Sequence, residues 1–169
     1  MIANKQFGEI FLLKITKVRR WVREFLPPDE KAKKRSGYTR EMSEAEAWEV
    51  FWGGHILVEL DGYSIAEAKR IISDLRDWMK SVGLYPGFSK SQRDSVSISI
   101  EISKQVGKEL SFSYICKEIL EKGFDEETKI VTERYRHFII GETASGRFYG
   151  TKRLNISNHF DEFMYNMCK

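Results

Sequence analysis

The sequence predicts an α+β protein in which a mostly helical half, residues 1–86, precedes a small α+β domain, residues 87–169. Two observations predict this class. Apolar side chains recur every three or four residues through most of the first half, which is typical of amphipathic helices. Residues 96–102 instead alternate between apolar and polar side chains, which is typical of a half-buried strand. A polar stretch at residues 87–94 separates the two patterns.

A short basic helix is predicted from residue 17 to residue 26, after another helix within residues 7–14. Its apolar side chains share one stripe, formed by Val18, Trp21, Val22, Phe25 and Leu26. Its cationic side chains lie largely outside that stripe: Lys17, Arg19, Arg20 and Arg23. We expect Thr16 to cap its start and Pro27-Pro28 to end it, because proline has no amide donor. Two packed helices with a basic second helix indicate a helix-turn-helix.

Two further helix starts carry a capping-box sequence. Ser43 with Glu46, and Ser64 with Glu67, have the S-x-x-E spacing that satisfies backbone amides at a helix start. The second helix is predicted to run from Ser64 to Val82, and the tryptophans between the boxes are expected in the core. Gly53-Gly54 interrupts this apolar segment and predicts a bend or a close helix contact.

Positive charge is concentrated at the start of the chain. Residues 1–42 hold 11 Lys and Arg against 5 Asp and Glu, although the whole chain has a formal net charge of only +3. A basic face of this kind is the electrostatic pattern expected of a protein that binds a polyanion, and a short basic stretch is also compatible with a merely solvated face.

The order of motifs in residues 7–80 resembles the winged helix-turn-helix DNA-binding domain of the MerR superfamily of transcription regulators. The resemblance is carried by "VRRWVREFLPP", "RSGYTREMSEAEA" and "LDGYSIAEAKRII", similar to that family's recognition helix, wing and fourth helix. It implies a homodimer that binds double-stranded DNA. It also implies a set of DNA-binding residues on the helix and the wing, namely Lys17, Arg19, Arg20, Arg23, Arg35, Tyr38 and Arg40.

The second half is predicted to fold as strand, helix, hairpin and helix. The strand covers residues 96–102, and a helix is predicted from Phe112 to Leu120. Two strands within residues 129–141 and 146–157 are expected to form a hairpin, and residues 158–167 a closing helix. The cationic side chains of this hairpin interleave with aromatic ones, so it is either a second nucleic-acid surface or an amphipathic hairpin. They are Arg134, Arg136, Arg147, Lys152 and Arg153.

No catalytic, cofactor-binding or metal-binding motif occurs, and Cys116 and Cys168 have no zinc or disulfide pattern. We therefore expect a protein that is not an enzyme, holds no cofactor or metal, and is cytoplasmic with no membrane partner. The leading hypothesis is a sequence-specific transcriptional regulator whose C-terminal domain dimerises or binds a small-molecule or protein effector. Two alternatives stay open: an excisionase-like or architectural DNA-binding accessory factor, and a protein-interaction module with a basic N-terminus.

Overall fold

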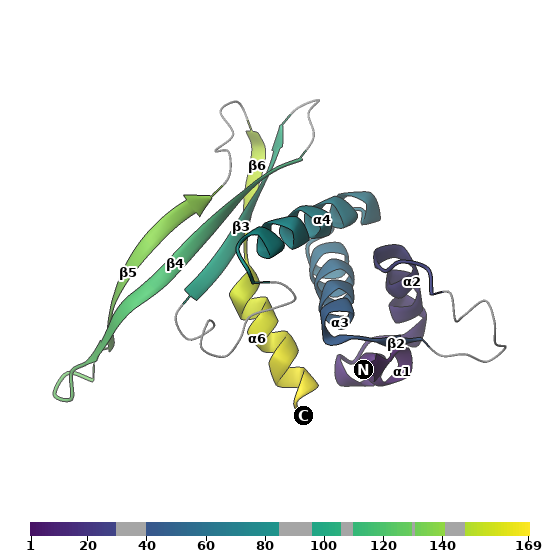
Figure 1. Ribbon diagram of the computed structural model, residues 1–169, viewed down its shortest axis with the longest axis horizontal. Helices are drawn as coiled ribbons and strands as arrows, with labels where there is room; N and C mark the ends of the chain where they lie inside the picture. The colour runs from purple at the N-terminus through teal and green to yellow at the C-terminus, as the bar shows by residue number, and fades with distance from the viewer. Residues whose placement is uncertain (30–39, 85–95, 106–109, 130, 141–147) are drawn as a thin grey trace. The chain divides into compact units, whose positions relative to one another are not determined.

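The chain contains several helices and a small antiparallel sheet, which confirms the predicted α+β class (Figure 1). The computed structural model describes residues 1–29, 40–84, 96–105, 110–129, 131–140 and 148–169. Internal contacts divide the chain into two compact units. The N-terminal unit comprises Met1–Gly87 together with Glu162–Lys169, and the C-terminal unit comprises Phe88–Asp161. Residues 162–169 thus join the first unit although they follow the second in the chain.

Helices make up most of the N-terminal unit. In chain order they are α1 (Asn4–Ile10), α2 (Ile15–Phe25), α3 (Glu44–Val50), the π-helix η2 (Phe51–Leu60) and α4 (Ile65–Ser81). Two short strands, β1 (Ile2–Ala3) and β2 (Glu41–Met42), pair in antiparallel fashion. The helices expected before residue 14, from residue 17 and from residue 64 are therefore all present.

Helix α2 begins earlier than predicted. Its N-cap residue is Lys14, with extended backbone and no side-chain cap, so the expected cap at Thr16 is wrong. Thr16 lies inside the first turn and is exposed. At the other end α2 stops at Phe25, and Leu26 has extended backbone, as expected of residues that approach a proline pair.

Both capping boxes are confirmed. At the start of α3 the Ser43 hydroxyl accepts from the Glu46 amide at 3.2 Å, while the Ser43 amide donates to the Glu46 carboxylate at 2.8 Å. Ser64 and Glu67 make the same pair of bonds at the start of α4. These local bonds stabilise the two helix starts and fix where α3 and α4 begin.

An aromatic cluster forms the core of the N-terminal unit. Phe51 contacts three other rings of this cluster, with centroid distances of 4.8–6.1 Å. Its members come from α1 and the residue that follows it, from α3 and η2, and from residues 162–169: Phe7, Phe11, Trp48, Phe51, Trp52 and Phe163. Trp48 and Trp52 are buried, as predicted for the tryptophans. Phe163 is fully buried, so residues outside the first 87 complete this core.

The glycine pair lies in η2, where this helix meets α2. A methyl group on Gly54 would come within 2.2 Å of the Trp21 ring, and one on Gly53 within 2.2 Å of Ile72. The predicted close helix contact is therefore confirmed. Because Gly54 has no side chain, the Trp21 indole of α2 can rest directly on the backbone of η2.

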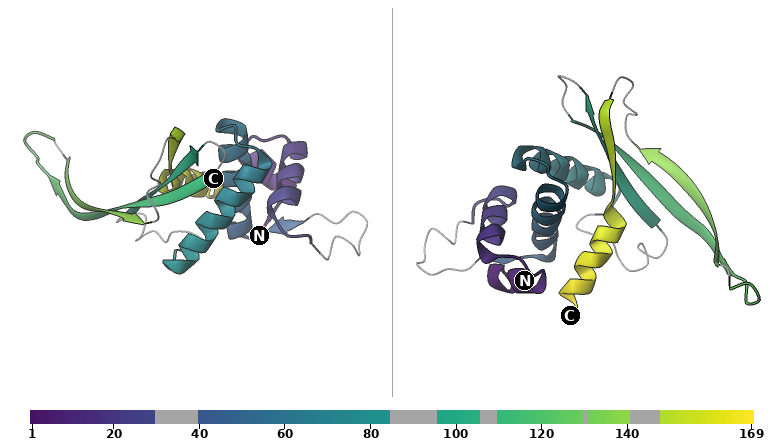
Figure 2. Two further views of the ribbon diagram at one scale, coloured as in Figure 1. Left: turned by 90° about the horizontal axis from the view of Figure 1, so that it is seen from above. Right: turned by 180° about the vertical axis from the view of Figure 1, so that it is seen from behind.

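A four-stranded antiparallel sheet with the order β5-β4-β3-β6 forms most of the C-terminal unit (Figure 1). Its elements are β3 (Val96–Gln105), β4 (Leu110–Phe124), β5 (Val131–Ile140), β6 (Phe148–Asn155) and the first part of α6 (Ile156–Met167). The buried face of β3 carries Ile98, Ile100 and Ile102. Beyond Glu118, β4 pairs with β5 alone, and this two-stranded ribbon extends past the end of β3 (Figure 2).

Two predictions for this unit are wrong. Residues 112–120 form part of β4 and not a helix, because each residue from Leu110 to Glu118 lies opposite a residue of β3; Ile100 lies opposite Tyr114, for example. The strands β5 and β6 do not form a hairpin with each other. They lie at opposite edges of the sheet, since β6 pairs with β3 and β5 pairs with β4.

Candidate nucleic-acid interface

Helix α2 presents a basic stripe on the side opposite its buried residues. Val18, Trp21, Val22 and Phe25 face the core. With about 3.6 residues per turn, the outward direction is then shared by Thr16 and three exposed arginines. We call Arg19, Arg20 and Arg23 the basic stripe.

The guanidinium groups of the basic stripe are largely uncommitted. Within the described part of the chain, Arg19 and Arg20 make no hydrogen bond or ion pair. Arg23 has only a long contact, with 3.8 Å between its Nη2 atom and Glu24 Oε1. Three cations with solvated donors therefore lie within two turns of one helix, where they are available to an external anion.

Lys17 differs from the arginines because it is paired inside the unit. Its ammonium group donates to the carboxylate of Glu59 in η2, and His55 Nδ1 lies 3.7 Å from the other oxygen of that carboxylate. The hydrogen bond from Lys17 is the largest cause that lowers the pKa of Glu59 below its ordinary value. Lys17 is thus exposed, as predicted, but its charge is already matched.

The same flank of α2 carries a second ion pair. Lys69 of α4 donates to Glu24 at 2.8 Å, and this hydrogen bond is the largest cause that lowers the pKa of Glu24. Together the two pairs hold the flank of α2 against η2 and α4. They also neutralise the one carboxylate that α2 carries next to its arginines.

Beside the basic stripe, a groove of about 520 Å³ separates the start of α1 from α2. The charged residues of its lining are the cations Lys5, Arg19, Arg23 and Arg40 and one carboxylate, Asp29. A basic groove focuses its electrostatic field, so it attracts a polyanion more strongly than a flat basic surface does.

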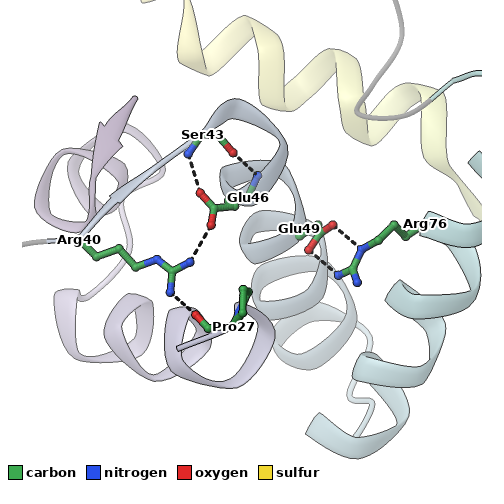
Figure 3. A network of polar contacts seen from close by, with 6 residues as sticks. All are labelled: Pro27, Arg40, Ser43, Glu46, Glu49 and Arg76. Carbon is green, nitrogen blue, oxygen red and sulfur yellow. Dashed lines mark hydrogen bonds and ion pairs between the residues drawn. The ribbon is translucent and has the colours of Figure 1, made fainter. Parts of the chain in front are cut away.

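The guanidinium group of Arg40 makes hydrogen bonds within the fold and is not presented at the surface (Figure 3). Its Nη1 atom donates to the Pro27 carbonyl at 2.5 Å and its Nη2 atom donates to Glu46 Oε1 at 2.6 Å. Only 14% of the side chain is exposed. Arg40 therefore ties the exit of α2 to the capping box of α3, a role that sequence reasoning missed. The other wing residues of the predicted site, Arg35 and Tyr38, lie outside the described residues.

A second structural pair, also drawn in Figure 3, joins α3 to α4. Arg76 donates from Nε and Nη2 to the two oxygens of Glu49 at 2.7 and 2.6 Å. Glu49 is buried, and the two hydrogen bonds from Arg76 compensate for the water that its carboxylate loses on burial.

Replacement of Arg40 by alanine should lower stability at neutral pH by about 1–2 kcal/mol, because a charged hydrogen-bond partner of Glu46 is lost. Burial raises the pKa of Glu46, but bonds from Ser43 and Arg40 outweigh it and leave the pKa lowered. Because the pKa of Glu46 is lower in the folded protein than its value of 4.5 in the unfolded chain, ionised Glu46 stabilises the fold at pH values above 4.5. This stabilisation is lost as the pH falls through the pKa of the folded protein. As the pH is lowered, the free energy of unfolding of the variant should therefore fall less than that of the unaltered protein.

Urea unfolding of both proteins across that pH range measures the difference. Arg19→Ala is the matched control, since its guanidinium has no acceptor in the described chain. Equal stability of Arg40→Ala and Arg19→Ala at every pH would contradict the structural role of Arg40.

The predicted second basic surface is described only in part. Lys152 and Arg153 are exposed on β6, and Arg153 Nε donates to Glu101 at 2.9 Å. The side chains of Arg134, Arg136 and Arg147 lie outside the described part of the chain.

The described residues contain no cluster of three or more His, Cys, Asp or Glu side chains that could hold a metal ion. No described helix is long and apolar enough to cross a membrane. Both cysteines are free thiols, and burial raises the pKa of Cys116.

Comparisons with protein-family models, with curated proteins and with solved structures find no significant match. Function is therefore inferred from the geometry and charge of α2 and its surroundings.

Proposed function

We propose that this protein binds duplex DNA sequence-specifically and regulates transcription. In this proposal α2 is the recognition helix of a winged helix-turn-helix domain like that of the MerR superfamily, and Arg35 and Tyr38 act as its wing residues. The order α1, α2, β2, α3 and α4 is compatible with such a domain.

The observation that carries the proposal is the basic stripe. The fold pairs Lys17 and Glu24 internally but leaves Arg19 and Arg20 without an acceptor in the described chain. Helix α2 has 11 residues and is about 16 Å long, a length that the major groove accepts. Arginine there binds the O6 and N7 acceptors of guanine with two hydrogen bonds.

Position along α2 suggests a division of roles. The first residues of a recognition helix contact base edges, which assigns Thr16, Arg19 and Arg20 to the bases. Arg23 lies one turn later and is assigned to a phosphate, as are the wing residues Arg35 and Tyr38. Arg40 is withdrawn from this set because its donors are used inside the fold.

Selection of bound duplexes from a random library, followed by binding titrations on the preferred duplex, tests the proposal. Arg20→Ala should weaken binding to the preferred duplex by roughly tenfold to a hundredfold, and binding to random duplex much less. Arg23→Ala should weaken both about equally and reduce the slope of log affinity against log salt by about one contact.

Lys80→Ala is the control, because it removes one positive charge from the exposed last turn of α4. Failure to enrich any duplex, or equal losses in Lys80→Ala and Arg20→Ala, would overturn the proposal.

A further inference from the structure

The turn between α1 and α2 places a leucine where a glycine is expected. Leu12 has a φ angle of +53°, and Lys129 is the one other non-glycine residue with positive φ in the described chain. Leu12 donates to the Glu9 carbonyl at 3.4 Å, and Leu13 donates to the Gly8 carbonyl at 2.8 Å. This pair of bonds is the Schellman ending of a helix, in which the left-handed position is usually glycine.

The same leucine is almost completely exposed. Its exposed fraction is 93%, the highest among the exposed large apolar residues of the described chain. A leucine at this position is therefore unfavourable twice: its side chain strains the left-handed backbone, and its apolar surface stays in water. Because 93% of Leu12 is exposed, packing within the described part of the N-terminal unit offsets little of either cost, so the offset is expected from a bound partner.

The surroundings of Leu12 indicate which partner. A groove of about 440 Å³ runs from Leu12 across Leu13 and Ile15 to Arg19 of the basic stripe. Lys5 also lines it, and the one carboxylate in its lining, Glu9, is paired with Lys5 at 3.8 Å. The apolar residues of this groove can contact an apolar group of a ligand, while its cations bind phosphates of the same ligand.

We propose that Leu12 reads thymine by contact with its C5-methyl group in the major groove. This inference rests on the proposed function, because it needs α2 in that groove. Leu12 precedes the first residue of α2 by three positions, so it lies beside the end of the recognition helix that meets the bases. The thymine methyl is the one apolar group that a base pair presents in the major groove. Arg19 then supplies hydrogen bonds, while Leu12 supplies discrimination by apolar contact.

The test uses the full chain and the preferred duplex from the selection. Each thymine is replaced in turn by deoxyuridine, which lacks the methyl group and keeps the same hydrogen-bonding edge. At one or two positions the replacement should weaken binding of the unaltered protein by roughly threefold to tenfold, as expected for one buried methyl group. Leu12→Ala should bind the thymine and deoxyuridine duplexes equally.

Leu60→Ala is the matched control, since Leu60 is another leucine of the N-terminal unit with 63% exposure. It should respond to deoxyuridine as the unaltered protein does. Leu12→Gly gives an independent readout: its melting temperature should rise by about 2–4 °C while its affinity for the preferred duplex falls.

The outcomes separate the two proposals. If a duplex is selected but no deoxyuridine position matters, or Leu12→Ala stays as sensitive as the unaltered protein, the role of Leu12 is wrong and DNA binding stands. If no duplex is selected, the proposed function fails and this inference fails with it.

Discussion

Replacement of Phe163 by alanine should lower the free energy of unfolding of the N-terminal unit by about 3–5 kcal/mol. Phe163 is fully buried although it follows Gly87 by 76 positions in the sequence. Its ring stacks on Phe11 at 5.6 Å and contacts Trp48 and Phe51 at the same centroid distance. Alanine would remove these contacts and leave a cavity among the three rings.

Urea unfolding followed by tryptophan fluorescence measures this loss, because Trp48 belongs to the affected cluster. Tyr165→Ala is the matched control. Tyr165 is an aromatic residue on the same helix, but it is 66% exposed, and its ring lies 4.2 Å from the Lys169 ammonium in a cation-π pair. It should change stability by less than about 1 kcal/mol. Equal effects of the two substitutions would show that Phe163 is not part of the core.

Gly54→Ala should destabilise the N-terminal unit by about 2–3 kcal/mol, although alanine ordinarily favours a helix over glycine by about 1 kcal/mol. The added methyl group would lie 2.2 Å from Cδ2 and 2.5 Å from Cε3 of Trp21. The indole is rigid and buried, so relief requires α2 to move away from η2. Because α2 carries the basic stripe, this variant should also bind the preferred duplex more weakly under conditions in which it is folded.

The adjacent glycine provides the control. In Gly53→Ala the closest atom is Ile72 Cδ1 at 2.2 Å, the end of a side chain that can rotate. Its cost should therefore be smaller than that of Gly54→Ala. Thermal unfolding of both variants decides the comparison, and a Gly54→Ala protein as stable as the unaltered one would contradict direct packing of Trp21 on the η2 backbone.

Local signals account for the parts of the fold that could be predicted. Serine and glutamate three residues apart determine where α3 and α4 begin, because the bonds they make involve only neighbouring backbone. The proline pair ends α2 for an equally local reason. By contrast, the spacing of residues 112–120 is compatible with a helix and a strand, and only pairing with β3 decides in favour of the strand. The π-helix was not predicted, since its apolar run shows no clear period and such helices are rare.

The exposed cations of α2 were predicted for the same reason, since helical spacing separates them from the apolar stripe. Their pairing could not be predicted. Lys17 finds Glu59 42 residues later, and Arg40 finds the Pro27 carbonyl 13 residues earlier, so both partners depend on how the elements pack. Leu12 was overlooked because its sequence neighbourhood is apolar, and only its φ angle and exposure distinguish it.

The place of Phe163 in the N-terminal core also affects the order of events during protein synthesis. A ribosome adds roughly 5–20 residues per second, and it makes all of residues 88–161 between Gly87 and the segment that fills the aromatic cluster. During those seconds Phe11, Trp48 and Phe51 lack one of their neighbours. The basic helix α2 is therefore translated early, but the core that supports it is complete only after the C-terminal unit has been synthesised.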